Sequence, residues 1–394
     1  MTAISRGSIV QTVKKPRADI RAISRLVPAS GNLVQGQNET AINPALVAAL
    51  ADVVSSGLNH YSFFEGVEGL RRAVAEKIRL HNNVPIDPDR RPLELIVTSG
   101  ATGALVPIAR TFLTGASALV FEPYYPYHER ILREFDGSID SVALRGDDLT
   151  LDVDELREVC RRASARALYP MKAIIVGTPG NPTGRVFTRT ELESIVDCAE
   201  EFDLLLIADE VYEHFVAAPG GHVSVASLPG AFQRTITVNS FSKCWAISGW
   251  RIGFAYGPGH LISPLVPHGG LYYVCTPTPL QEALGRVLLA DPAYYDRLRE
   301  SFIRKRNILV RALESTGFRP YNSRSNFYVW ARIPERFADA SDLNEVLLRE
   351  AGMAAVPGSA FVQDSEDDRF MRFCVAREDA MLEDVAQRLV RTLG

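Results

Sequence analysis

The sequence predicts an α/β protein in which a mostly parallel sheet lies between helices, followed by a smaller α+β unit. Short apolar runs without polar alternation recur between residues 95 and 238, which is typical of strands covered on both faces. Amphipathic helical segments separate these runs, and repeated strand, helix and strand favours a parallel sheet. The length of 394 residues allows one large and one small domain.

The strands of the large sheet are predicted at five short segments. They are residues 95–97, 118–121, 173–176, 204–208 and 235–238. Leu70, Val74 and Ile78 recur four residues apart within residues 67–80, which predicts an amphipathic helix with one buried face. A second such helix is predicted over residues 191–200, between the third and fourth strands.

A long helix is predicted to connect the two domains. Asp291 is a suitable N-cap, Pro292 a suitable first helical residue, and the apolar periodicity continues to about Ser315, before Gly317. Beyond it, residues 327–331 and 371–375 are predicted strands and residues 340–350 a predicted helix. This mixture indicates a small α+β domain at the C-terminal end.

Composition excludes several classes of function. A net charge of -4 with scattered basic residues provides no basic field for nucleic acid. The first 25 residues include Lys14, Lys15 and Arg17 but no apolar core of a secretory signal, and no run approaches a membrane span. The five cysteines are odd in number and far apart, which indicates neither a disulfide framework nor a metal site. We expect a cytoplasmic protein without nucleic-acid, membrane or metal partners.

The most informative segment contains Ser240, Ser242 and Lys243, directly after a predicted strand, with Arg251 eight residues later. An amine among hydroxyls and a guanidinium suits a cofactor that carries an aldehyde and a phosphate. The amine can form a Schiff base while the hydroxyls and the guanidinium neutralise the phosphate. A lysine beside serines is, by itself, more often a solvated surface residue.

Two further segments have a chemical rationale of their own. Asp209 follows the predicted strand at 204–208, and a carboxylate there would keep a pyridine nitrogen protonated and improve the ring as an electron sink. An isolated aspartate at this place more often caps the next helix. Residues 98–105 lie between a strand and a helix, where backbone N–H groups can hold an anion, although the glycine pattern alone is weak.

Together these segments resemble the class I/II aminotransferases, which are pyridoxal-phosphate enzymes of fold type I in the aspartate aminotransferase superfamily. The pattern S-x-S-K-x5-G-W-R-x-G around Lys243 matches the family's lysine signature, and Asn181-Pro-Thr-Gly and Asp209-Glu-x-Tyr match two more of its motifs. The resemblance implies a seven-stranded, mostly parallel sheet. It also implies that residues 1–45 join the small domain, that 46–290 bind pyridoxal 5'-phosphate, and that 291–394 form the connector helix and the small domain.

The resemblance implies a role for each matching residue. Lys243 would carry the Schiff base and move the proton at the substrate's Cα, and Asp209 would hold the ring nitrogen. Tyr212 and Asn181 would bind the 3-oxygen, and Tyr125 would stack on the ring. The phosphate would be bound by Gly100, Ala101, Thr102, Ser240, Ser242, Arg251 and, from the partner subunit of a homodimer, Tyr61. The substrate would be bound by Gly36, Asn181 and Arg372.

The implied activity is an aminotransferase that converts an L-amino acid and a 2-oxo acid through a quinonoid intermediate. A lyase, cyclase or oxidase would keep the same residues, so these alternatives stay open. A ligand-sensing regulator would need a DNA-binding domain, but only 30 residues precede Gly31, and a dehydrogenase would need a G-x-G-x-x-G that is absent. Cys244 and Trp245 stand where relatives usually have smaller or polar residues, and a buried Cys244 is more often packing than a nucleophile. No second arginine for a dicarboxylate substrate is recognisable.

Overall fold

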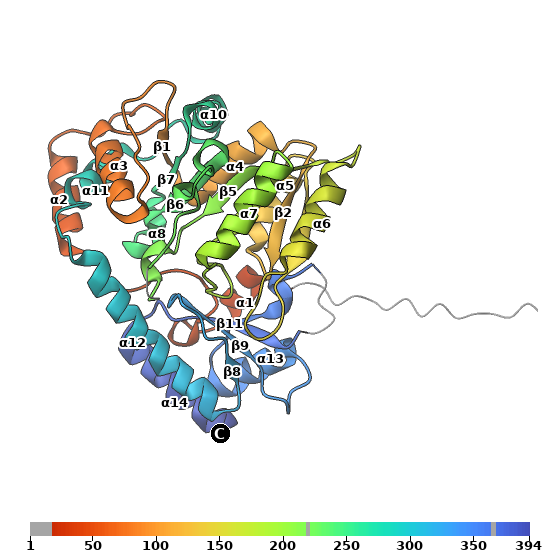
Figure 1. The fold of residues 1–394 in the computed structure, drawn as a ribbon. Coiled ribbons are helices and arrows are strands. Elements are labelled where there is room, and N and C mark those ends of the chain that lie inside the picture. Colours follow the sequence, from red (N-terminus) through yellow and green to blue (C-terminus); the bar gives the residue numbers. More distant parts are fainter. Residues whose placement is uncertain (1–17, 218–220, 364–367) are drawn as a thin grey trace, which may run out of the picture.

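The computed structural model describes residues 18–217, 221–363 and 368–394 (Figure 1). Lys14, Lys15 and Arg17, on which part of the expectation about a targeting signal depends, lie outside these residues. The described chain forms two sheets with helices around them, and the long helix α12 (Tyr294–Ser315) runs along one side of the molecule from the large sheet to the small one. No helix in the described ranges is both long and apolar enough to cross a membrane.

The large sheet has seven strands in the order β1-β7-β6-β5-β4-β2-β3. Neighbouring strands are parallel except β7, which is antiparallel to β1 and β6, so the expected mostly parallel sheet is confirmed. The strands are β1 (Leu95–Thr98), β2 (Ser117–Glu122), β3 (Ser138–Ala143), β4 (Met171–Gly177), β5 (Leu205–Asp209), β6 (Thr235–Ser240) and β7 (Gly253–Tyr256).

Two of these strands were not among the five predicted segments. β3 is the edge strand of the sheet, and most of its side chains are only partly buried, so it has no continuous apolar run. β7 has only four residues and follows directly on the turn that contains Arg251, so its apolar run is too short to be recognised as a strand in the sequence. Both strands are determined by their pairing with neighbours rather than by a local pattern.

Helices cover both faces of the large sheet because alternate strand residues point to opposite sides. Ile175 packs with α4 (Gly100–Phe112) and α5 (Pro126–Arg133), whereas Ile174 packs on the other face with α6 (Val153–Ser164) and α7 (Arg189–Glu201). Further helices surround this core. They are α2 (Pro44–Ser55), α3 (Glu68–Asn82), α8 (Phe241–Cys244), α9 (Gly259–Ile262), α10 (Leu265–Tyr273) and α11 (Thr278–Val287).

The small sheet is antiparallel, with the order β10-β11-β9-β8. Its elements are β8 (Arg319–Pro320), β9 (Tyr328–Arg332), α13 (Ala340–Ala351), β10 (Val356–Pro357), β11 (Phe370–Cys374) and α14 (Asp379–Leu393). The N-terminal segment with α1 (Ile20–Leu26) lies against this sheet, because Asn32 bridges to Ala354 and the Cys374 N–H donates to the Leu33 carbonyl at 2.9 Å.

The predicted start of the connector helix was wrong by a few residues. α12 begins at Tyr294, not at Pro292, and its N-cap position is Ala293. Asp291 instead closes a turn in front of the helix, where its carboxylate accepts the Ala293 N–H at 3.2 Å and pairs with Arg297. The capping signal was genuine, but it belongs to this preceding turn.

Candidate active site

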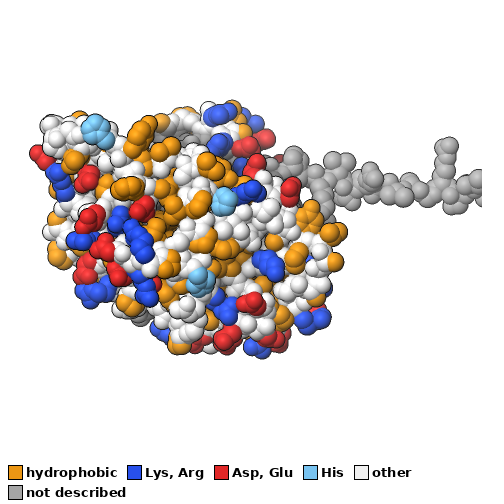
Figure 2. Space-filling view, turned by 90° about the horizontal axis from the view of Figure 1, so that it is seen from above, with side chains coloured by type: hydrophobic (Ala, Val, Ile, Leu, Met, Phe, Trp, Pro, Cys, Tyr) orange, Lys and Arg blue, Asp and Glu red, His pale blue; other side chains and the backbone are white. Residues whose placement is uncertain are grey.

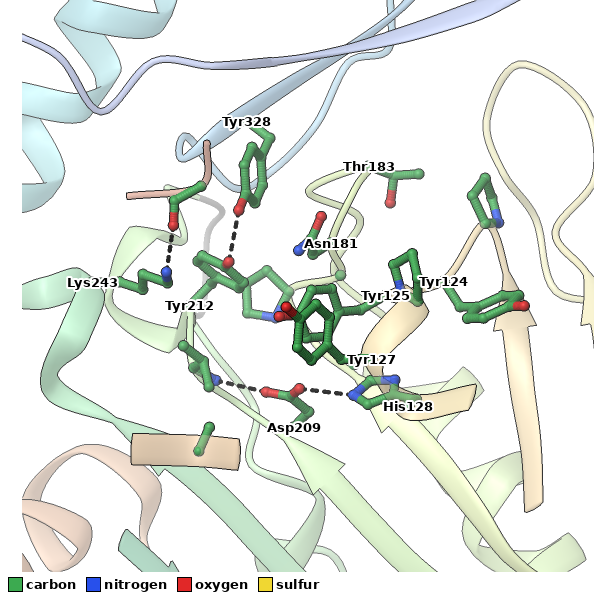
Figure 3. Close-up of a pocket in the computed structure, with 18 of the residues that line it drawn as sticks. Tyr124, Tyr125, Tyr127, His128, Asn181, Thr183, Asp209, Tyr212, Lys243 and Tyr328 are labelled. Atoms are coloured by element: carbon green, nitrogen blue, oxygen red, sulfur yellow. Dashed lines mark hydrogen bonds and ion pairs between the residues drawn. The ribbon is translucent and has the colours of Figure 1, made fainter. Parts of the chain in front are cut away.

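A cavity of about 340 Å³ opens at the carboxyl ends of the strands β4, β5 and β6, next to the N-terminal segment and the small sheet (Figure 3). All predicted site residues except Gly100 and Tyr61 line it. They are Gly36, Ala101, Thr102, Tyr125, Asn181, Asp209, Tyr212, Ser240, Ser242, Lys243, Arg251 and Arg372. Ligands of open parallel sheets bind at this edge, where the loops that follow the strands meet.

Lys243 lies on the short helix α8, directly after β6. Ser240 caps this helix: its hydroxyl accepts the Ser242 N–H at 3.2 Å, and the two hydroxyl oxygens are 2.8 Å apart. The Lys243 amine donates to the carbonyl of Gly36 from the N-terminal segment. The structure therefore brings together three predicted residues from β6 and α8 with a fourth from more than 200 positions away.

The Lys243 amine is set up to be partly uncharged near neutral pH. Burial lowers its pKa to about 8, and the cationic Arg251 and Arg372 act in the same direction, although Cys374 and Asp209 oppose them. Only the neutral amine is a nucleophile towards an aldehyde. A lowered pKa in a cavity therefore fits Schiff-base chemistry.

A buried ion pair supports the turn that carries this lysine. The amine of Lys77 on α3 pairs with Glu213, which accepts a hydrogen bond from the Asn239 amide at 2.5 Å. The Asn239 side-chain oxygen in turn accepts the Ser240 N–H at 2.7 Å. All four side chains are almost fully buried, so the chain of contacts connects the lysine turn to the interior of the large domain.

Another part of the cavity lining has donors that suit an anion. α4 begins at Gly100, so the backbone N–H groups of its first turn, which includes Ala101 and Thr102, have no partner within the helix. The Arg251 guanidinium lies beside this terminus, donating to the Ser248 carbonyl at 3.0 Å. Gly100 has φ +67°, and a Cβ there would lie 2.3 Å from the Arg251 side chain, so only glycine leaves room for this arrangement.

Asp209, at the end of β5, has a partner that sequence reasoning missed. Nε2 of His128 on α5 lies 3.0 Å from the Asp209 carboxylate, and His128 is buried. His128 follows Tyr125 by three residues, which places the two on one turn of chain, with ring centroids 5.5 Å apart. That spacing was the available signal. The contact orients the carboxylate towards the cavity.

Arg372 on β11 is 2% exposed and yet keeps an unused donor. Its Nη1 donates to the Asn181 side chain at 2.9 Å and its Nη2 to the Val34 carbonyl, whereas Nε has no partner among the described residues. Arg372 lines the cavity without a carboxylate partner among the described residues, and such a guanidinium favours a bound carboxylate, since an unpaired buried charge is costly.

Two arginines that sequence reasoning did not nominate also line the cavity. Nη2 of Arg21 on α1 donates to the Tyr127 hydroxyl at 2.5 Å. The guanidinium carbons of Arg21 and Arg130 lie 5.8 and 5.7 Å from the Tyr127 ring centroid. Because more than 100 residues separate these arginines, no local motif could pair them. They add positive charge beside Tyr125, whose ring stacks on that of Tyr127 at 5.1 Å.

The remaining predicted positions divide clearly. Cys244 and Trp245 are buried in the core, and burial raises the pKa of the Cys244 thiol to about 12, which disfavours a thiolate nucleophile. Tyr61 is 86% exposed and does not line the cavity of its own chain. Phe63 and Leu271 are 80% and 85% exposed. Hydrophobic side chains are spread over the face seen in Figure 2.

These features fit pyridoxal phosphate at three points. A buried amine of lowered pKa suits its aldehyde, a helix N-terminus beside a guanidinium suits its phosphate, and a carboxylate at the end of a strand suits its ring nitrogen. With a seven-stranded sheet and a second antiparallel sheet, the chain has the architecture of a pyridoxal-phosphate enzyme of fold type I.

Comparison with known proteins gives the family. The model of aminotransferase class I and II matches residues 29–389. The aspartate aminotransferase of Pyrococcus abyssi is 33% identical over 346 residues, which is 87% of this chain and 86% of that one. The structure of N-succinyldiaminopimelate aminotransferase from Mycobacterium tuberculosis superposes with a TM-score of 0.87 at 30% identity, covering 95% and 96% of the two chains. The chain belongs to the class I and II aminotransferase family, whose members use pyridoxal phosphate.

Proposed function

We propose that this cavity transfers an amino group between an L-amino acid and a 2-oxo acid, with Lys243 moving the proton at Cα. When bound, pyridoxal phosphate supplies the electron sink for that step. Asp209 would keep the ring nitrogen protonated, Tyr212 would donate to the 3-oxygen, and Arg372 would hold the substrate's α-carboxylate. The Lys243 amine with its lowered pKa and the Arg372 guanidinium, which has no carboxylate partner among the described residues, line one cavity and support this function most directly.

One turnover without an acceptor tests the reaction. The holoenzyme, mixed with its amino donor alone, is expected to convert its cofactor stoichiometrically to pyridoxamine phosphate and to release the matching 2-oxo acid, because Lys243 can return a proton to the cofactor. Mass spectrometry of cofactor and product measures both. Many turnovers without an acceptor, giving a cyclised, dehydrated or oxidised product, would identify a lyase or an oxidase instead.

Arg372→Ala is expected to lower kcat/KM for every amino acid, because it removes a charge-assisted contact worth about 2–4 kcal/mol. Arg130→Ala is the matched comparison. We propose that Arg130 and Arg21 face the substrate's side chain, so Arg130→Ala should lower kcat/KM only for substrates with a second acidic group. Steady-state kinetics with an aliphatic and an acidic amino acid distinguishes the effect of Arg372→Ala from that of Arg130→Ala. An unchanged kcat/KM in Arg372→Ala would assign the α-carboxylate to another group.

We further propose a homodimer in which Tyr61 reaches the cofactor phosphate of the partner subunit. Its exposure, together with the exposed Phe63 and Leu271, supports this, since large exposed apolar side chains favour an interface. Sedimentation velocity measures the oligomeric state.

We also propose domain boundaries at residues 1–45, 46–290 and 291–394. A cytoplasmic location suits the five free cysteines. We propose a role in amino-acid metabolism, such as a biosynthetic process.

A further inference from the structure

Tyr328 lines the cavity and has no role in the assignments above. It is the first residue of β9 and is 2% exposed. Its hydroxyl oxygen lies 2.8 Å from that of Tyr212, and the two rings are 5.4 Å apart (Figure 3). Among the described residues, neither hydroxyl has another hydrogen-bond partner. The pair has two protons and only one internal hydrogen bond, so one proton remains for a group bound in the cavity.

The position of Arg372 favours Tyr328 as the donor of this hydrogen bond. Its guanidinium carbon lies 4.6 Å from the centroid of the Tyr328 ring, and a nearby cation makes a phenol more acidic. Burial raises the pKa of Tyr328 to about 12, and Arg372 is the largest opposing influence; burial also raises the pKa of Tyr212, where Arg372 opposes the rise less than other causes support it. The phenol that carries the cation on its ring is the better donor, which favours Tyr328 over Tyr212 as the source of the proton between the two hydroxyls.

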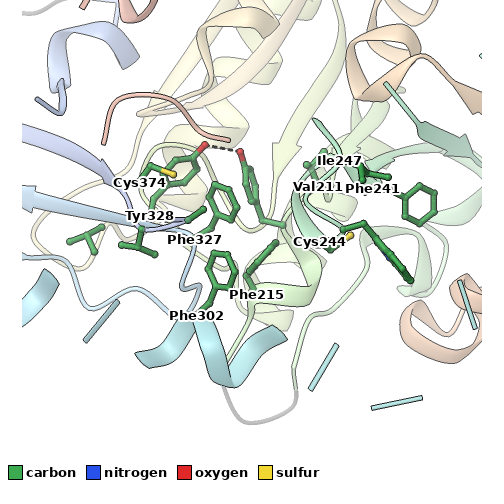
Figure 4. Packing of buried hydrophobic residues seen from close by; sticks show 14 of the residues in the cluster. Val211, Phe215, Phe241, Cys244, Ile247, Phe302, Phe327, Tyr328 and Cys374 are labelled. Atoms are coloured by element: carbon green, nitrogen blue, oxygen red, sulfur yellow. Dashed lines mark hydrogen bonds between the residues drawn. The ribbon is translucent and has the colours of Figure 1, made fainter. Parts of the chain in front are cut away.

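The backbone around Tyr328 leaves its hydroxyl no alternative position. A Cβ on Gly36 would lie 1.9 Å from the Tyr328 hydroxyl oxygen, so the N-terminal segment passes directly against it. On the other side the ring packs against Phe327 at 4.9 Å, at the end of an aromatic cluster that also contains Phe215 and Phe302 (Figure 4). The hydroxyl is therefore held between Gly36 and Tyr212.

We propose that Tyr328 is a positioning residue of the aminotransferase site: its hydroxyl donates to Tyr212 and directs the Tyr212 proton to the 3-oxygen of pyridoxal phosphate, while its ring supports the Arg372 guanidinium. A hydroxyl that accepts a hydrogen bond becomes a stronger donor, because hydrogen bonds in a chain polarise one another. The inference rests on the proposed contact between Tyr212 and the cofactor.

Tyr328→Phe removes the hydroxyl and keeps the ring. In the holoenzyme without substrate, the pH midpoint of the cofactor's long-wavelength absorbance is expected to rise by about half a pH unit. The reason is that weaker donation to the negative 3-oxygen lets the lysine-linked nitrogen hold its proton to higher pH. The KM for amino acids should stay unchanged. Tyr328→Leu removes the ring as well, so it should also raise KM for every amino acid by roughly fivefold.

Two controls separate this role from a structural one. In a Tyr212→Phe background, Tyr328→Phe should cause no further shift of the midpoint, because the effect acts through Tyr212. Tyr256→Phe removes another buried hydroxyl, which bonds Ser224 outside the cavity, and should leave the midpoint unchanged. If the wild type shows a pH-dependent absorbance band and the midpoint in Tyr328→Phe is unchanged or lower, the role of Tyr328 is overturned and the proposed site is not. A wild type without a pH-dependent band overturns the proposed site itself.

Discussion

Lys243→Ala is expected to abolish the covalent link to the cofactor and to lower turnover by about 10⁴-fold or more, since it removes both the Schiff-base amine and the proton carrier. The wild-type protein should be yellow and the variant colourless after dialysis. Borohydride reduction of the wild type followed by peptide mapping should label Lys243. Lys172→Ala changes an exposed lysine on β4 and should behave as the wild type. A label on any other lysine would refute the assignment.

The lowered pKa of Lys243 gives this prediction a pH dependence. The neutral amine attacks the aldehyde, and its fraction rises as pH passes through about 8. Capture of pyridoxal phosphate by the apoenzyme, followed by stopped-flow absorbance, should therefore accelerate with a midpoint near pH 8. The ordinary lysine pKa of 10.5 would place the midpoint more than two pH units higher. That higher midpoint would mean that the amine is solvated.

Asp209→Ala is expected to lower turnover on the order of 10³-fold, because the ring nitrogen loses the carboxylate that keeps it protonated. Folding should survive. The loss leaves His128 without its partner at 3.0 Å, which costs about 1–3 kcal/mol of stability. Single-turnover kinetics and thermal unfolding, measured side by side, separate the chemical effect from the structural one.

Asp197→Ala is the matched control for this change. Asp197 is exposed on α7, and its loss should alter neither turnover nor the unfolding temperature. Turnover of Asp209→Ala close to the wild-type value would show that the ring nitrogen needs no carboxylate here. Its collapse into an unfolded protein would instead make Asp209 a structural residue. The substitution Asp209→Asn, which preserves the shape, would then be compared for turnover in the folded state.

The residues that we propose for cofactor chemistry were recognisable before the structure because each lies in a short segment with its own pattern. Lys243 sits among hydroxyls after a strand, and Asp209 ends the next strand in the sheet. Strands of this kind have continuous apolar runs, since both faces are buried, and the carboxyl ends of parallel strands meet at one edge. Local order along the chain therefore implied that these two residues meet.

Contacts between distant segments had no pattern of this kind, and the spacing of His128 from Tyr125 was the one local sign of any of them. His128 meets Asp209 across 81 positions, Tyr328 meets Tyr212 across 116, and Gly36 meets Lys243 across 207. None of these pairs shares a periodicity. Each depends on how α5, β9 and the N-terminal segment pack against the sheet.

The hydrophobic period of the sequence therefore predicted the sheet class, because it follows from patterns within a few neighbouring residues, and the resemblance of its short motifs to the aminotransferases implied the cofactor and the candidate site residues. Only the tertiary structure decided the pKa of the Lys243 amine, the two arginines beside Tyr127 and the hydrogen bond between Tyr328 and Tyr212. Burial, charge proximity and donor geometry are distances in space, and chain folding sets them without leaving a local pattern.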